Sequence, residues 1–162
     1  MQKIELTQLA VTGLRITLVV AFALLVVFQT LSFPGQFAHM AREEPDLAYL
    51  QWPMTAFAVL ELVCVQVVIV CTWRLLTMVQ QDRIFSEEAL RWVDRIIGAM
   101  AVAWVGLLVA FSYAGITAGD PGVPMLLMLL LLCSGALGLL MVVLRALLRQ
   151  ATTLRTDMEA VI

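Results

Sequence analysis

The polar side chains that interrupt the long apolar stretches of this sequence are its best candidates for chemistry. Glu61 is the one acid clearly inside such a stretch, and Gln29 is expected at a similar depth in the stretch before it. An ionisable residue at that depth suggests a function by default. One interpretation is an outward-opening polar pocket or proton-linked site; the other is a protonated Glu61 that hydrogen-bonds Gln29 and locks two helices together. The second is preferred, because no relay partner accompanies the acid.

Two further polar residues are expected near mid-membrane. Gln66 shares its stretch with Glu61, and Ser134 lies in the last stretch. Both are predicted to form hydrogen bonds between helices. His39 and Glu43 have the i, i+4 spacing of two helical neighbours, but a metal site usually needs three or four ligands. A solvated acidic loop is therefore expected there, with no metal.

The cysteines give no sign of a disulfide framework or redox motif. Cys64, Cys71 and Cys133 lie in apolar stretches without a CxxC pair, so they are predicted to be small buried hydrophobes. Cys64 and Cys71 are seven residues apart on one helix face, about 10 Å, which is too far for a disulfide. No hydrolase, metalloprotease or nucleotide-binding motif occurs either. The sequence predicts a protein that is not an enzyme and binds no cofactor.

Composition defines the class of fold. Of the 162 residues, 62% are hydrophobic and 14% charged, against about 45–50% and about 25% in soluble domains. The excess must face lipid, so we predict an all-α integral membrane protein with a single domain covering residues 1–162. A membrane-spanning helix needs about 20 apolar residues. Four spans are expected at residues 14–34, 54–78, 96–117 and 123–148, with prolines at their edges.

The positive charges predict the orientation, because cytoplasmic loops carry an excess of Lys and Arg. On one side of the predicted spans, Arg42 is the single Lys or Arg residue. The other side holds Lys3, Arg15, Arg74, Arg83, Arg91, Arg95, Arg145, Arg149 and Arg155. We therefore expect both termini and the middle loop in the cytoplasm, and the two remaining loops outside.

The middle loop is patterned as a helix. Ser86 can cap its start, with Glu87 and Glu88 in the first turn. An apolar stripe follows at helical spacing, formed by Ala89, Leu90, Val93, Ile96 and Ile97. We expect a cytoplasmic amphipathic helix between the second and third spans, lying along the inner interface and running into the third span. Its charges serve either as a topology anchor or as a contact for a partner, the two being weighed about equally.

The end of the chain repeats this pattern, so the fourth helix is predicted to extend into the cytoplasm. Together the two segments define the candidate partner-binding residues: Phe85, Ser86, Glu87, Glu88, Arg91, Asp94, Arg95, Arg155, Asp157 and Glu159. Pairs of small residues four apart in the last two spans allow close helix packing, within the chain or in a homo-oligomer.

Both segments carry a family resemblance. RIFSEEALRWVDRIIG resembles a PFSEENVRRLRRIG-like segment of the bacterial family called domain of unknown function 2975 (DUF2975), and LRTDMEAVI resembles its LREENELTI-like end. The sequence departs from that pattern at Ala89, at Arg91–Trp92 and in lacking the Glu–Asn pair near the end. The resemblance implies a four-span bacterial inner-membrane protein without an established activity. Members of the DUF2975 family are often encoded beside a small helix-turn-helix regulator.

The leading functional hypothesis is therefore a partner-binding or regulatory membrane protein that works through its cytoplasmic face. In one form of this hypothesis it tethers a helix-turn-helix regulator without touching nucleic acid itself. The alternative is a transporter or channel subunit with an outward-facing polar pocket around Glu61 and Gln29.

Overall fold

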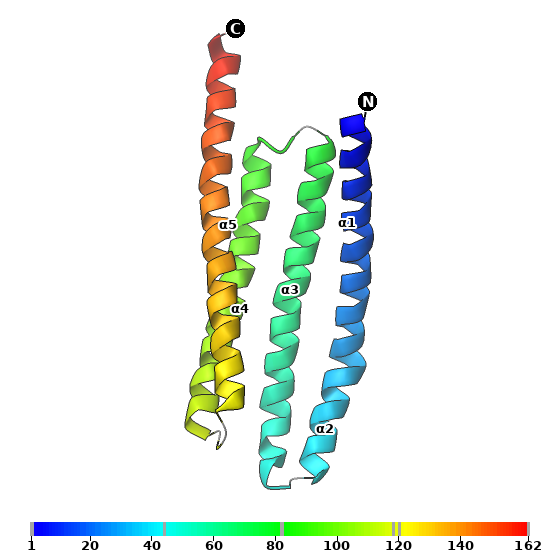
Figure 1. The fold of residues 1–162 in the computed structure, drawn as a ribbon, viewed down its shortest axis with the longest axis vertical. Coiled ribbons are helices and arrows are strands. Elements are labelled where there is room, and N and C mark those ends of the chain that lie inside the picture. The colour runs from blue at the N-terminus through cyan, green and yellow to red at the C-terminus, as the bar shows by residue number, and fades with distance from the viewer. Residues whose placement is uncertain (1, 44, 82, 118, 120, 162) are drawn as a thin grey trace. The chain divides into compact units, whose positions relative to one another are not determined.

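The regular structure of this chain is helical throughout the part that is described. The structure is a computed structural model describing residues 2–43, 45–81, 83–117, 119 and 121–161, without the side chains of residues 2–8, 47, 155 and 159–161. The elements are α1 (Gln2–Val27), the π-helical turn η1 (Phe28–Ser32), α2 (Phe33–Glu43), the 3-10 helix η2 (Pro45–Leu50), α3 (Gln51–Gln80), α4 (Glu87–Thr117) and α5 (Gly122–Val161) (Figure 1). The all-α prediction is confirmed.

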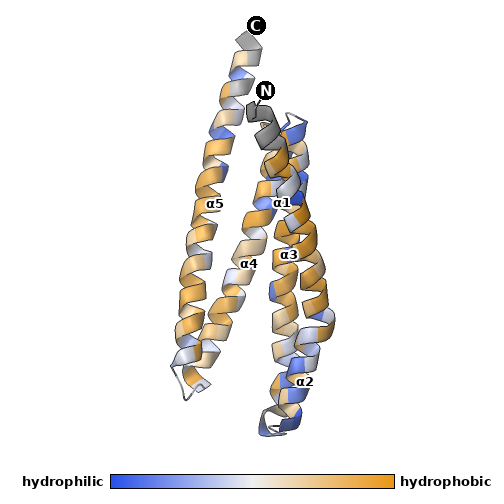
Figure 2. Cartoon of the chain, turned by 45° about the vertical axis from the view of Figure 1, so that its right-hand side comes forward, coloured by the Kyte–Doolittle hydropathy of each residue, from blue (hydrophilic) through white to orange (hydrophobic). Residues whose placement is uncertain are grey.

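Four helical stretches within the described residues are long and apolar enough to cross a membrane. They are Leu9–Glu43, Ala48–Gln80, Glu87–Thr117 and Gly122–Met158, and each contains one predicted span. Hydrophobic residues dominate α1, α3 and α5, whereas hydrophilic ones gather on α2 (Figure 2). Large apolar side chains stay exposed on these helices; Ile116 is 86% exposed and Met125 75%. Exposing so much apolar surface to water would be unfavourable, whereas contact with lipid is not.

The first helical stretch continues past Pro34, where the sequence predicted its end. Pro34 is the second residue of α2, which runs on to Glu43. Directly before it, η1 widens the helix: the Phe33 N–H bonds to the Phe28 oxygen, five residues back. A proline normally breaks a helix because its ring clashes with the carbonyl four residues earlier. A π-helical turn relaxes that spacing, so the helix passes the proline without ending.

The described contacts divide the chain into two compact units, residues 1–76 and 77–162, with the boundary inside α3. In the first unit, α3 returns antiparallel beside α1 and η1 (Figure 1). The guanidinium carbon of Arg15 on α1 lies 5.2 Å from the ring centre of Trp73 on α3. An amide pair also joins η1 to α3, and it is described with the site below.

In the second unit, α4 and α5 form an antiparallel hairpin around the short turn after Thr117. The Trp104 indole N–H of α4 donates to the Leu131 carbonyl of α5 at 3.1 Å. Gly135 lies opposite Trp104: a Cβ added to it would be 3.1 Å from the indole nitrogen. The close approach of the two helices therefore depends on a residue without a side chain.

The register of this hairpin leaves the end of α5 without a neighbour from α4. Trp104 and Gly135 are equally far from the turn between the helices. Trp104 is counted back from Thr117, where α4 ends, and Gly135 is counted forward from Gly122, where α5 begins. The same counting places Glu87, the first residue of α4, opposite Thr152. Residues 153–161 therefore project about 13 Å beyond α4, at about 1.5 Å per residue. The long α5 helix in Figure 1 shows this extension.

Candidate functional site

The charged end of the second unit, formed by the α3–α4 connection, the first turns of α4 and the last turns of α5, holds most of the predicted partner-binding residues. Ser86 caps α4, as the sequence predicted: its Oγ accepts the Ala89 N–H at 3.3 Å and donates to the Arg83 carbonyl at 2.7 Å. The Arg83 N–H in turn bonds to the Met78 carbonyl at 2.9 Å. These bonds give the connection a defined local structure.

The amphipathic segment forms the first turns of α4, which continues without interruption to Thr117. No proline or separate turn divides it from the third span. Of its apolar stripe, Ala89, Leu90, Val93 and Ile96 are buried within the protein. What these first turns of α4 leave exposed is therefore their charged face.

One ion pair on that face joins neighbours in the sequence. Glu87 and Arg91 have the i, i+4 spacing of a helical ion pair, but Glu88 with Arg83 is the pair that forms, at 3.2 Å. Arg95 stacks over the ring of Trp92, at 4.3 Å from its centre. Glu87 and Arg91 are both exposed and form no ion pair with any residue that the structure describes. Among the described residues nothing engages these two charges, so another molecule can contact them.

A salt bridge that sequence reasoning missed joins the two helices here. The guanidinium of Arg145 on α5 holds both oxygens of Asp94 on α4, with Nη2 3.0 Å from Oδ2 and Nε on Oδ1. Counted from Thr117 and from Gly122, Asp94 and Arg145 are equally far from the turn, so the pair obeys the register set by Trp104 and Gly135. Because the turn after Thr117 is short, counting residues outward from it in the sequence could have predicted that Asp94 and Arg145 face each other.

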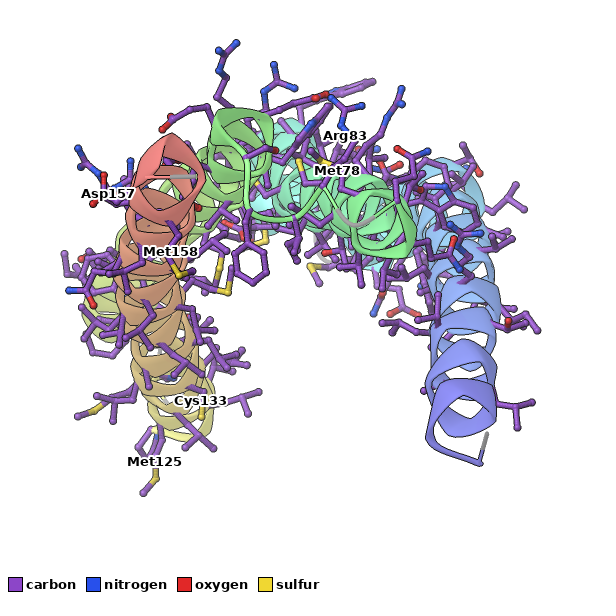
Figure 3. All side chains as sticks on the ribbon, turned by 90° about the horizontal axis from the view of Figure 1, so that it is seen from above. Met78, Arg83, Met125, Cys133, Asp157 and Met158 are labelled. Carbon is purple, nitrogen blue, oxygen red and sulfur yellow. The ribbon has the colours of Figure 1, made fainter. Side chains whose placement is uncertain are left out.

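The other predicted residues of the charged end are placed as follows. Phe85 is 44% exposed, and Asp157 is exposed on the projecting end of α5 (Figure 3). The side chains of Arg155 and Glu159 lie outside the described residues. Thr152 is buried where α4 begins opposite it. The surface thus consists of a capped, charged helix start beside a helix that extends past it.

The amide residues within the spans form one pair between helices. Gln29 of η1 and Gln66 of α3 exchange hydrogen bonds, at 2.9 Å and 3.5 Å. The predicted role of Gln66 is confirmed, but its partner is Gln29, which we had assigned to Glu61. Glu61 is half-buried, and its Oε1 has no hydrogen-bond partner in the part of the chain that is described. Glu61 precedes Gln66 by five positions, which turns it away from the face that Gln66 presents to Gln29.

Ser134 and Cys133 differ from their predictions. The Ser134 hydroxyl donates within its own helix, to the Leu130 carbonyl at 2.7 Å. A serine in an apolar helix can satisfy its hydroxyl locally in this way and needs no partner helix. Cys133 is exposed, whereas Cys64 and Cys71 are buried as expected. A thiol is a small apolar group, so in an apolar helix it is as compatible with contact with lipid as with burial inside the protein.

His39 and Glu43 lie in the helix α2, where we expected a solvated acidic loop, and their side chains meet at the i, i+4 spacing, with Nδ1 3.5 Å from Oε2. Both side chains are exposed, 71% and 70% respectively. An exposed pair of this kind contributes little to stability.

The helices and their pairings define a class: a multi-pass membrane protein whose spans are held together by a few polar contacts and close helix packing. The family is also defined. Residues 35–162 match the model of the family described as "Protein of unknown function (DUF2975)", so this chain belongs to the DUF2975 family. The match includes both segments that carried the resemblance. No curated protein and no solved structure matches the chain.

Proposed function

We propose that this protein is a non-enzymatic partner-binding protein of a bacterial inner membrane, with both termini and the α3–α4 connection in the cytoplasm. The orientation is supported by the positive charges of the sequence, of which Arg42 alone falls on the opposite side of the spans. Under this orientation, the charged end of the second unit faces the cytoplasm.

The observation that carries the proposal is the state of Glu87 and Arg91. A segment that only sets topology needs no more than positive charge. This end has in addition a capped helix start and an ion pair between neighbouring residues. It also exposes one acid and one base that no described residue engages. Beside it, α5 projects about 13 Å past α4. Such a corner offers two helix surfaces to a cytoplasmic protein, and a small helix-turn-helix regulator is the partner we propose.

The test is a charge exchange, Glu87→Arg with Arg91→Glu, in the tagged protein. The exchange keeps the net charge of the loop, so the charge rule for topology predicts unchanged insertion. A partner that reads the order of the two charges meets like charges instead. We expect its recovery in a crosslinked pull-down from native membranes to fall roughly tenfold or more.

The matched control is the exchange Arg42→Glu with Glu43→Arg on α2, which is exposed and outside the charged end. It should leave recovery unchanged. Equal recovery of the same protein by the wild type and the Glu87/Arg91 exchange would contradict the proposal. A recovered DNA-binding protein would identify the partner as a regulator.

The transporter alternative keeps one specific observation in its favour, the Glu61 oxygen without a hydrogen-bond partner among the described residues. If Glu61 serves a proton-linked site, proteoliposomes of the wild type show a pH-dependent flux and Glu61→Gln abolishes it. Glu43→Gln, the same change at an exposed acid, should leave that flux intact. Absence of flux from the wild type, with Glu61→Gln changing only thermal stability, would leave Glu61 a structural residue.

A further inference from the structure

The α4–α5 hairpin carries an apolar groove on one of its sides. The groove has a volume of about 450 Å³, and its walls include Ala101, Trp104 and Val105 of α4 with Gly135, Gly138 and Val142 of α5. Small residues in the α5 wall leave room for it: a Cβ on Gly138 would meet nothing within 4 Å. The groove lies within the two helical stretches long and apolar enough to cross a membrane.

One end of the groove leads to positive charge. Gly138, Val142, Arg145 and Arg149 follow at intervals of four, three and four positions, so they share one stripe of α5. Arg145 is held by Asp94 at that end. Arg149, one turn further, is exposed, and its side chain forms no ion pair or hydrogen bond with any described residue. A cation unpaired by the described residues therefore lies about 10 Å beyond Val142, the last residue of α5 that lines the groove.

The distances match one leaflet of a bilayer. Ser134 lines the deep end of the groove, and Arg149 lies about 22 Å from it along the helix axis. Half of a bilayer, headgroups included, is about 20–22 Å thick. With Arg149 at the level of the lipid phosphates, the part of the groove between Val142 and Ser134 lies about 10–22 Å deeper, at the depth of the acyl chains.

We propose that this groove is a binding site for an anionic phospholipid, with an acyl chain along Trp104 and Gly138 and the phosphate on Arg149. The ligand must be apolar over most of its length and anionic at one end, and a phospholipid of the same leaflet has that form. Basic residues at the end of a groove between membrane helices are a recurrent way of selecting anionic headgroups. The site requires no particular orientation of the chain, so it is independent of the proposed partner.

The fluorescence of Trp104, which lines the groove, can show which lipid occupies it. With Trp52, Trp73 and Trp92 replaced by Phe, the protein is reconstituted in phosphatidylcholine with a minor fraction of brominated phosphatidylglycerol or, in parallel, of brominated phosphatidylcholine. We expect stronger quenching of Trp104 by the anionic lipid. Arg149→Gln should reduce that preference roughly fivefold, and Arg149→Lys should retain it. Added salt should weaken the preference of the wild type.

Arg42→Gln is the control, since it removes one exposed Arg far from the groove along the sequence and should keep the preference. Equal quenching by the two lipids would overturn the proposal. So would no quenching by either, which would mean that another helix, from a second copy or elsewhere, covers the groove. A second measurement keeps all native tryptophans: phosphatidylglycerol should co-purify with the wild type after mild extraction and be depleted from Arg149→Gln, and equal amounts on both would contradict the assignment.

Discussion

Replacing Asp94 by arginine is expected to loosen the α4–α5 hairpin and lower its thermal unfolding midpoint by several degrees. In the wild type, both Asp94 oxygens lie on the guanidinium of Arg145. After the substitution, two guanidinium groups face each other across the same gap. Neither side chain of the pair is more than half exposed, so solvent screens this repulsion less than it would on an open surface. Circular dichroism of the detergent-solubilised protein measures the midpoint.

The exchange Asp94→Arg with Arg145→Asp restores opposite charges and keeps the net charge. It should recover at least half of the lost midpoint, which is the signature of direct coupling. As a control, Glu88→Arg disrupts the more exposed pair with Arg83 and should shift the midpoint little. If the exchange variant were no more stable than Asp94→Arg alone, the salt bridge would not be what couples the helices.

Gly135→Val is expected to destabilise the same hairpin from its apolar side. The first atom of the new side chain would lie 3.1 Å from the Trp104 indole nitrogen, which is already held by the Leu131 carbonyl. The indole must leave that hydrogen bond or the helices must separate, and overpacking of this kind costs about 1–3 kcal/mol. For a chain of this size the unfolding midpoint should fall by roughly 2–4 °C per kcal/mol.

Gly138→Val is the matched control, one turn away on the same helix. It makes the same change of residue type and of helix propensity, but its Cβ meets no atom within 4 Å. The difference between the two midpoints isolates the contact with Trp104. Equal losses in both variants would show that valine in α5, rather than contact with the indole, is responsible.

The helical class, the four spans and the cap at Ser86 could be predicted because each rests on local sequence. Apolar run length fixes a span, and Ser86 followed by two glutamates marks a helix start. Pro34 was misjudged for a physical reason. A proline predicts a helix end only if the helix keeps its ordinary spacing, and the wider turn at Phe28–Ser32 changes that spacing.

Contacts between helices were harder to predict than the helices. Gln29 pairs with Gln66 and Asp94 with Arg145 because of how two helices are rotated and aligned, which single-helix periodicity does not give. The short turn after Thr117 did constrain the second pair, since a register can be counted from it. The first pair involves a π-helical turn, which rotates the face of Gln29 relative to an ordinary helix. Exposure of Cys133 likewise depends on which face of α5 its neighbour covers.

The length of α5 has a mechanical consequence. The helix is fixed to α4 at Gly135 and at Arg145, so any tilt of the hairpin in the bilayer carries the projecting end with it. Val161, at the end of α5, lies about 39 Å from Gly135 along the helix axis. A change of tilt of about 10°, within the range by which spans adjust to bilayer thickness, moves that end sideways by about 7 Å. The hairpin is thus a lever that converts a change in membrane thickness into a displacement at the surface where we place the partner.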